Sequence, residues 1–196
     1  VNNSFESAEE QAAFDVYDAN NINPLYGFFV ARAGLGASES MRSKLAEHND
    51  PRLSRAFITK QGTSGKEQAP GTADNAVYAP NGTPEQGTSQ YGTSLFMYSI
   101  SAPTLLLSYH ELKFLEAEAL CRLERDAKSA LKDAVVAGLL NAENSFTISR
   151  KELGKTLINA ASSITEAEAE SYFDNTIEAK YTAEPLKTTM TQKYFA

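Results

Sequence analysis

The chain has 196 residues, of which 42% are hydrophobic and 22% charged, with 11 glycines and 7 prolines. This length suits one domain or two small ones, and the composition excludes collagen-like, disulfide-framework and wholly disordered proteins. The net charge of −7 argues against nucleic acid as a partner, because contact with phosphates needs a basic surface.

The sequence contains one cysteine, Cys121, and no tryptophan. A single cysteine cannot form an internal disulfide and says nothing about the redox compartment. The start of the chain carries no signal-peptide pattern. The longest uncharged stretch, 86–110, is interrupted by glycines, serines and Pro103, so no membrane-spanning helix is expected.

Two short helices are predicted in the first 60 residues. The first covers 5–17, where apolar residues recur near helical spacing. Residues 20–24 end it, because asparagines favour turns and the residue before a proline avoids the helical region. Segment 24–33 is aromatic-rich without a clean period. Ser38 caps a second predicted helix, which ends at Asn49-Asp50-Pro51.

Residues 61–94 differ from the rest, since 17 of these 34 residues are Gly, Pro, Ser or Thr and the tetrapeptide QGTS occurs at 61–64 and 86–89. Such a composition predicts an irregular loop. Long loops on rigid scaffolds often carry recognition, and Tyr78 and Tyr91 keep a binding loop open as the alternative to a plain flexible loop.

From Pro103 onward the pattern is helical. One helix is predicted from Pro103 to about Arg125, because proline is favoured near the first helical position. Asp126 caps the next helix, 127–142, whose inner side is rich in alanine. The pair has the size and alanine pattern of a tetratricopeptide-type hairpin. The first helix carries two apolar stripes, one of Leu105, Leu112, Leu115, Ala119 and Leu123 and another of Leu107, Phe114, Ala117 and Cys121.

Three more helices are predicted between residue 149 and the end of the sequence. Ser149 with Glu152, and Thr165 with Glu168, form capping-box patterns that open helices at 149–161 and after 165. The last helix covers 183–195. Its apolar residues Leu186, Met190 and Tyr194 share one face.

Signatures of catalysis and metal binding are poor. The segment beginning at His110 (HELKF) starts like a zinc-protease helix, but phenylalanine stands where the second histidine belongs. His110 is therefore predicted to be a helix-surface residue, and no metal or cofactor is expected. Glycine-rich phosphate loops, dinucleotide fingerprints and nucleophile elbows are absent from the sequence. Glu118 with Arg122 and Glu124 with Lys128 are predicted to form ordinary i,i+4 ion pairs.

Three polar segments favour local structure over chemistry. Oxygen-rich residues between Asp15 and Asn23 suit Asx turns better than a cation site, because a calcium loop's glycine and distal glutamate are missing. Asn81-Gly82 favours a tight turn over use as a glycosylation acceptor. Asp50 and Arg52, on either side of Pro51, are placed to pin a helix end to a neighbouring element.

Four segments follow one another along the chain. They are NPLY at 23–26, NDPRL at 49–53, YHELKFLEAEA at 109–119 and TQKY at 191–194. Their order and spacing resemble the SusD/RagB family of outer-membrane nutrient-binding lipoproteins of Bacteroidetes. Outside the Gly/Thr-rich loop, the resemblance covers most of the chain, as an internal to C-terminal part of a longer protein.

The composition and the helical patterns, together with the resemblance, predict a mainly α-helical fold, with a tetratricopeptide-like hairpin core and a long Gly/Thr/Ser-rich irregular loop insertion. The resemblance implies that 1–196 is one partial domain, and the patterns divide it into helices and turns (1–60), the loop region (61–102) and a helical part (103–196). The resemblance also implies a surface-exposed lipoprotein of the outer membrane, with its lipid anchor outside this chain and a SusC-like TonB-dependent transporter as partner.

The function that the resemblance implies is binding, not catalysis. An oligosaccharide or other nutrient would be held without cofactor and delivered to the transporter. The alternatives are a helical-repeat protein-interaction scaffold and, last, a glycoside hydrolase with dispersed carboxylates. Aromatic rings stack on sugar faces and amides bond sugar hydroxyls, so loop position and chemistry select four candidate ligand-binding residues. These are Tyr78, Asn81, Gln90 and Tyr91.

Overall fold

The computed structural model describes residues 5–31, 37–53, 55–61, 66–68, 78–82, 93–94, 100–153 and 163–196. It divides into two compact units. We call residues 1–14, 104–143 and 164–196 the helical unit, and residues 15–103 and 144–163 the loop-rich unit. Whether both belong to one domain, as the sequence predicts, stays a prediction.

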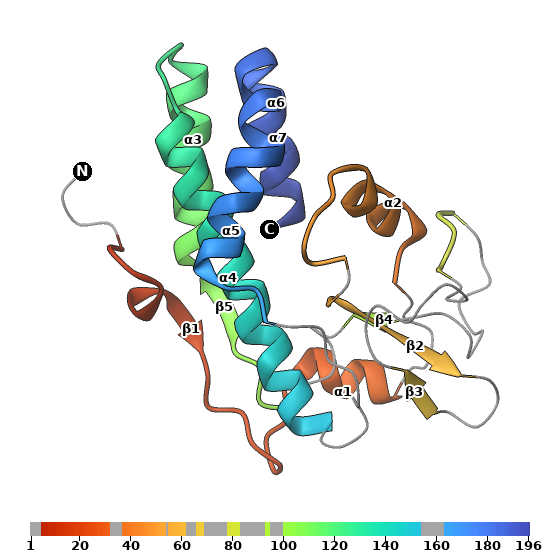
Figure 1. Cartoon of the computed structure of the whole chain (residues 1–196). Helices are drawn as coiled ribbons and strands as arrows, with labels where there is room; N and C mark the ends of the chain where they lie inside the picture. The colour runs from red at the N-terminus through yellow and green to blue at the C-terminus, as the bar shows by residue number, and fades with distance from the viewer. Residues whose placement is uncertain are drawn as a thin grey trace. The chain divides into compact units, whose positions relative to one another are not determined.

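The helical unit is built around a layer of helices (Figure 1). Helix α3 (Tyr109–Arg122) and helix α4 (Lys128–Leu153) run antiparallel, and α4 continues into the loop-rich unit. The chain then forms α5 (Glu166–Tyr172), the π turn η5 (Phe173–Ile177), α6 (Glu178–Ala183) and α7 (Pro185–Phe195). The mainly helical fold predicted from the sequence is confirmed.

The core of the helical unit is apolar and continuous across its helices. Phe114 and Ala117 of α3 pack with Leu131 and Leu139 of α4 and with Phe173 of η5, all at 1% exposure or less. Small residues let the helices approach closely: a Cβ on Gly138 would lie 3.3 Å from the Cβ of Ala196. Of the two predicted stripes on α3, the one with Phe114 and Ala117 faces the core, whereas Leu115 and Leu123 are exposed.

Polar contacts join α4, and the two residues before it, to the chain that follows α4 in this unit. The Tyr181 hydroxyl accepts a hydrogen bond from the Ala127 N–H and donates one to Asp126. The buried Glu143 carboxylate accepts a hydrogen bond from the Ile164 N–H, 3.1 Å away. Asp126 also accepts from the Lys128 N–H, as the predicted cap requires. Lys128 pairs with Glu178, not with the predicted partner Glu124.

The predicted helix at 5–17 is wrong. The described residues form a short 3-10 turn, η1 (Ala8–Glu10), followed by strand β1 (Ala12–Phe14). β1 pairs antiparallel with β5 (Thr104–Leu107). A short isolated helix pays a high nucleation cost, and pairing with β5 satisfies the same backbone groups.

The predicted helix start at Pro103 is wrong for the same reason. Residues 104–107 are β5, and α3 begins only after Ser108, whose hydroxyl accepts a hydrogen bond from the Glu111 N–H at 3.1 Å. Ser108 and Glu111 have the capping-box spacing. This local signal decides where the helix begins, whereas Pro103 is equally compatible with extended chain.

The predicted break between 142 and 149 is also wrong, because α4 continues to Leu153. Between Gly138 and Gly154 the sequence has neither glycine nor proline, so nothing there ends a helix. Ser149 is 1% exposed inside α4 and is not an N-cap. The remainder of the predicted helix, 154–161, lies outside the described residues.

The helix openings predicted at 165 and near 183 are confirmed in their main features. The Thr165 hydroxyl accepts a hydrogen bond from the Glu168 N–H at 3.2 Å and caps α5. The last helix begins at Pro185, two residues later than predicted, because α6 ends at Ala183. Leu186, Met190 and Tyr194 of α7 are exposed, and its buried face carries Thr188, Thr189, Gln192 and Phe195.

The loop-rich unit combines short elements with turns. Helix α1 (Pro24–Ala31) begins where the sequence showed no clean period, because the Asn23 side chain accepts hydrogen bonds from the N–H groups of Leu25 and Tyr26. Helix α2 (Glu39–Glu47) follows. Strand β2 (Phe57–Gln61) pairs antiparallel with β3 (Lys66–Gln68) and with β4 (Thr93–Ser94). These strands were not predicted from the loop-like composition.

Side chains hold the turns of this unit. Asp18 accepts hydrogen bonds from the N–H groups of Asn20 and Asn21, which confirms the predicted Asx turn. The Arg52 guanidinium donates to both carboxylate oxygens of Asp50 at 2.9 and 2.7 Å, and both side chains are buried. This pair closes the turn that follows α2. That it also pins the end of the helix to a neighbouring element stays a prediction.

Candidate functional site

A segment around residue 79 is held against the start of α2 by backbone hydrogen bonds. The Ala79 N–H donates to the Ala37 carbonyl at 2.8 Å, and the Glu39 N–H donates to the Ala79 carbonyl at 3.0 Å. Ser38 caps α2 by accepting a hydrogen bond from the Met41 N–H. Two predicted ligand-binding residues, Tyr78 and Asn81, therefore lie beside the first turn of this helix.

Asn81 occupies a tight turn, as the Asn-Gly pattern predicts. Gly82 has a φ of +74°, a conformation that glycine adopts without strain. The Ser38 hydroxyl donates a hydrogen bond to Asn81 Oδ1 at 3.1 Å. The side chain of Asn81 is exposed, so its amide N–H groups face solvent and are able to bond a hydroxyl of a ligand.

Tyr78 is half-buried between an aromatic and a cationic side chain. Its ring meets the Phe57 ring edge-on, with centroids 5.6 Å apart, and the Arg42 guanidinium lies over the ring at 5.5 Å from the centroid. Burial raises the pKa of the Tyr78 hydroxyl, and the charge and hydrogen bonding of Arg42 oppose part of that rise. The phenol is therefore neutral at physiological pH and is able both to donate and to accept hydrogen bonds.

We call Ser38, Arg42, Phe57, Tyr78 and Asn81 the α2 cluster. Three of its members were not predicted as site residues. Ser38 was recognised as a helix cap, but its contact with Asn81 joins residues 43 positions apart, which no local pattern shows. Gln90 and Tyr91, the other two predicted ligand-binding residues, lie outside the described residues, so the structure does not place them relative to the α2 cluster.

A hollow lies in the helical unit, at the start of α3. It encloses about 300 Å³. His110 was predicted to be a helix-surface residue, and this is wrong: the ring is only 9% exposed, and its Nε2 lies 3.2 Å from the Ser108 hydroxyl. The capping serine orients the ring, which a helical-wheel argument cannot show. The lining residues are Leu105, Ser108, His110, Glu111, Phe114, Lys193 and Ala196.

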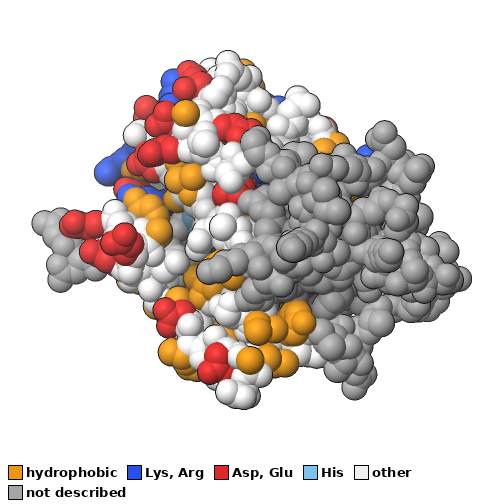
Figure 2. Space-filling model, turned by 60° about the horizontal axis from the view of Figure 1, so that its bottom comes forward, with side chains coloured by type: hydrophobic (Ala, Val, Ile, Leu, Met, Phe, Trp, Pro, Cys, Tyr) orange, Lys and Arg blue, Asp and Glu red, His pale blue; other side chains and the backbone are white. Residues whose placement is uncertain are grey.

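The described residues contain no group of three or more His, Cys, Asp or Glu side chains placed to hold a metal ion. Among the described helices, none has both the length and the apolar character needed to cross a bilayer. On the face seen in Figure 2, acidic side chains are spread over the described surface and basic ones are few, in keeping with the net charge of −7.

The helical fold and the order of these segments define a class of protein. A family model described as SusD-like, starch-binding and associating with the outer membrane matches residues 1–196. The chain belongs to this SusD-like family, as the sequence resemblance predicted. Among curated proteins, none matches the chain.

Solved structures agree with this assignment. A SusD/RagB family protein from Bacteroides thetaiotaomicron is 58% identical, with a TM-score of 0.91 over 98% of this chain and 41% of its own. A SusD homolog from Bacteroides fragilis has a TM-score of 0.70 at 20% identity, covering 97% of this chain and 42% of its own. A chitin-binding protein has a TM-score of 0.63 at 20% identity, covering 97% of this chain and 41% of its own. The chain thus spans about two fifths of the length of these proteins.

Proposed function

We propose that the protein containing this chain binds glycans or other nutrients at the bacterial cell surface, without catalysis, and delivers them to a TonB-dependent outer-membrane transporter. The observation that carries the proposal is the match of the whole chain to a family described as starch-binding and associating with the outer membrane. A relative with the same fold is a chitin-binding protein, which also favours a glycan ligand.

We further propose that Tyr78, Asn81, Gln90 and Tyr91 contact the ligand. Tyr78 and Asn81 lie together in the α2 cluster. The ring of Tyr78 is fixed by Phe57 and Arg42, so it loses little entropy when a sugar packs against it. Asn81 supplies amide groups that suit sugar hydroxyls.

The location at the outer membrane, through a lipid anchor outside this chain, and the partnership with a SusC-like transporter belong to the same proposal. The family description supports the location at the outer membrane, and the resemblance to SusD/RagB proteins supports the partnership. Co-purification of the full-length protein with a transporter encoded beside it tests the partnership. Recovery of the full-length protein only in soluble cell fractions would contradict the location.

Isothermal titration tests the binding function directly. The full-length protein is titrated with maltoheptaose, a starch fragment, and with chitohexaose. We expect binding of at least one neutral or acidic oligosaccharide, and we expect Asn81→Ala to weaken it. Flat titrations across a panel of plant, host and microbial oligosaccharides would overturn the proposal. Release of shorter products during the titration would favour the hydrolase alternative.

One observation favours a second function, a helical protein-interaction scaffold. Leu186, Met190 and Tyr194 form an exposed apolar face on α7, while the buried face of the same helix carries Thr188, Thr189 and Gln192. Exposed apolar faces are typical of surfaces that another protein element covers. The scaffold would bind a protein partner and show no affinity for glycans, so the titration above separates it from the first proposal.

A further inference from the structure

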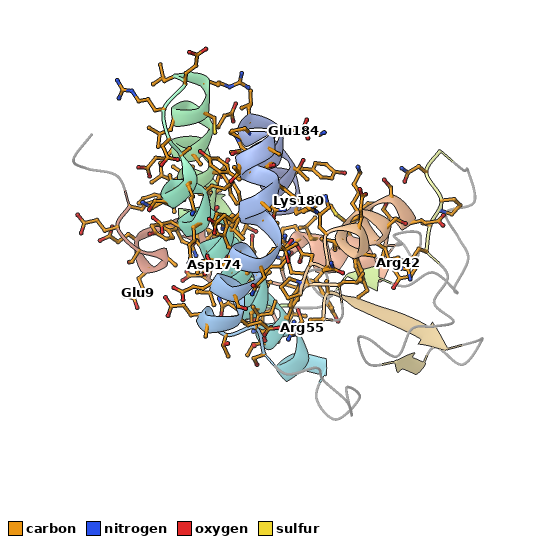
Figure 3. All side chains as sticks on the ribbon, turned by 45° about the horizontal axis from the view of Figure 1, so that its top comes forward. Glu9, Arg42, Arg55, Asp174, Lys180 and Glu184 are labelled. Carbon is orange, nitrogen blue, oxygen red and sulfur yellow. The ribbon has the colours of Figure 1, made fainter. Side chains whose placement is uncertain are left out.

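Arg42 is the cation of the α2 cluster. It projects from α2 in the loop-rich unit (Figure 3) and its side chain is exposed. Within the part of the chain that the structure describes, no carboxylate forms an ion pair with it. Its guanidinium lies over the ring of Tyr78, 5.5 Å from the ring centroid.

Stacking on a ring leaves the guanidinium able to bind an anion. The Cζ atom of Arg42 lies 5.5 Å from the centroid of the Tyr78 ring, and this contact with the π system engages none of the five N–H donors of the guanidinium in a hydrogen bond to a carboxylate. An arginine held in this way is pre-organised, and two of its parallel N–H groups match the two oxygens of a carboxylate. A neutral sugar hydroxyl uses only one of these donors and gains no charge assistance.

The neutral donors of the cluster lie beside this cation. Segment 78–82 places Tyr78 under Arg42 and Asn81 against Ser38, so one short segment presents a ring, an amide and a neighbouring guanidinium. The overall charge of the chain is −7, so any attraction of an anion must be local. Glu39, one helical turn before Arg42, is exposed and lowers that attraction without removing it.

We propose that the α2 cluster selects acidic oligosaccharides, with Arg42 binding a uronic-acid carboxylate and Asn81 bonding a neighbouring hydroxyl. This inference rests on the proposed glycan-binding function and narrows its ligand class. The charge and fork shape of Arg42 set the preference. The aromatic and amide groups supply binding common to acidic and neutral sugars.

The test uses a matched pair of ligands, an oligogalacturonate and its methyl ester of the same length, which differ in charge but keep the same rings. Oligomers of alginate and of glucuronate, each beside its methyl ester, are tested as further acidic ligands. We expect the full-length protein to bind at least one acid about tenfold more tightly than its ester, the scale of one charge-assisted contact. Raising the salt concentration should weaken binding of the acid and leave binding of the ester unchanged.

Two variants assign this preference to Arg42. Arg42→Gln should abolish the difference between acid and ester, and Arg42→Lys should retain part of it, because the charge stays but the fork is lost. Lys44→Gln is the matched control, since Lys44 is an exposed cation on the same helix two positions along and so on another face. It should leave the difference intact. Thermal unfolding of each variant shows that it is folded.

The outcomes separate the two proposals. Equal binding of acid and ester in every pair, or a preference unchanged by Arg42→Gln, overturns the acidic-ligand inference while the glycan-binding function stands. Binding of starch or chitin oligomers alone, with no binding of any acidic oligomer, also overturns the acidic-ligand inference and leaves the glycan-binding function standing. Failure of every oligosaccharide, acidic and neutral, overturns the proposed function and the inference together.

Discussion

The two units of this chain bury apolar and polar side chains in different proportions. The described part of the helical unit buries mostly apolar residues, such as Phe114, Leu131 and Phe173 at 1% exposure or less, and fewer polar ones, such as Glu143 and Gln192. The described loop-rich unit buries Asn23, Asp50, Arg52 and Arg55 beside a smaller apolar set. Both units are compact, so the contrast lies in how their backbone groups are satisfied.

The difference follows from backbone hydrogen bonding. A helix satisfies most of its own N–H and C=O groups, so its side chains are free to be apolar. An irregular chain cannot do this and needs side-chain partners. Asn23 bonds the N–H groups that open α1 and also donates to the Ala102 carbonyl at 2.8 Å, while Arg55 donates to the Pro51 carbonyl at 2.8 Å. Buried polar side chains thus stand in for missing secondary structure.

The largest expected effect tests the apolar side of this comparison. Phe173→Ala removes a fully buried ring at the centre of the helical core, and we expect a loss of about 3–5 kcal/mol in the free energy of unfolding. Urea denaturation followed by circular dichroism measures it. Leu115→Ala, at an exposed position of α3, is the control and should change the midpoint little. Equal effects of the two variants would contradict the placement of the core.

The second-largest expected effect tests the buried polar side chains of the loop-rich unit. Asp50→Ala leaves the buried Arg52 guanidinium without its carboxylate, and we expect a loss near the lower end of about 3–5 kcal/mol. Native-state hydrogen exchange at residues 52–57 measures the loss within the loop-rich unit.

The double variant Asp50→Ala/Arg52→Ala decides whether the pair acts as a unit. Removing both charges should cost less than the sum of the two single changes, because no uncompensated charge remains buried. Additive losses would mean that each side chain acts through contacts other than the pair.

The helical unit was the more predictable from the sequence, because its signals are local. The capping box of Thr165 with Glu168 appears in the structure, and of the two apolar stripes predicted on α3 the one with Phe114 and Ala117 is buried. The errors arose where two local signals compete over a few residues. The predicted helix start at Pro103 overlooked the capping-box spacing of Ser108 with Glu111, and only the pairing of β5 with β1, about 90 residues away in sequence, excludes the start at Pro103.

The candidate site was less predictable for a physical reason. Tyr78 and Asn81 were selected by residue type, but the contacts that define their surroundings come from Ser38, Arg42 and Phe57. These lie 21 to 43 positions away, and no periodic pattern links them. The buried Asp50–Arg52 pair was predictable because both residues flank one proline within three positions.

A smaller effect compares one helix cap in each unit. Asn23→Ala removes the acceptor for two N–H groups of α1 and the donor to Ala102, so we expect about 1–2 kcal/mol of destabilisation. Thr165→Ala removes a single cap bond from α5 and should cost about 1 kcal/mol or less. Thermal unfolding measures both. A larger effect for Thr165→Ala would reverse the view that the loop-rich unit depends more on polar side chains.

The smallest effect concerns charge on the helical unit. Glu118 accepts hydrogen bonds from Lys193 of α7 at 2.8 Å and from Arg122 at 2.7 Å. These two bonds, that from Lys193 first, hold the pKa of the Glu118 carboxyl below its usual value of 4.5. Glu118→Gln removes the titrating carboxyl and both ion pairs. We expect it to lower the free energy of unfolding by less than about 1 kcal/mol at neutral pH, since ion pairs near the surface contribute little.

The direction of the pH effect makes this small change measurable. Because the pKa of Glu118 is lower in the folded than in the unfolded chain, its contribution to stability is complete above about pH 4.5 and disappears as the pH falls through the folded pKa. The unfolding midpoint of Glu118→Gln should therefore approach that of the unchanged chain as the pH falls below about 4.5. Glu124→Gln, which removes an exposed carboxylate with no ion pair recorded in the described residues, should keep the original curve shape. Parallel curves for Glu118→Gln and the unchanged chain would show that the bridge from α3 to α7 adds no stability, leaving the apolar core to hold these two helices together.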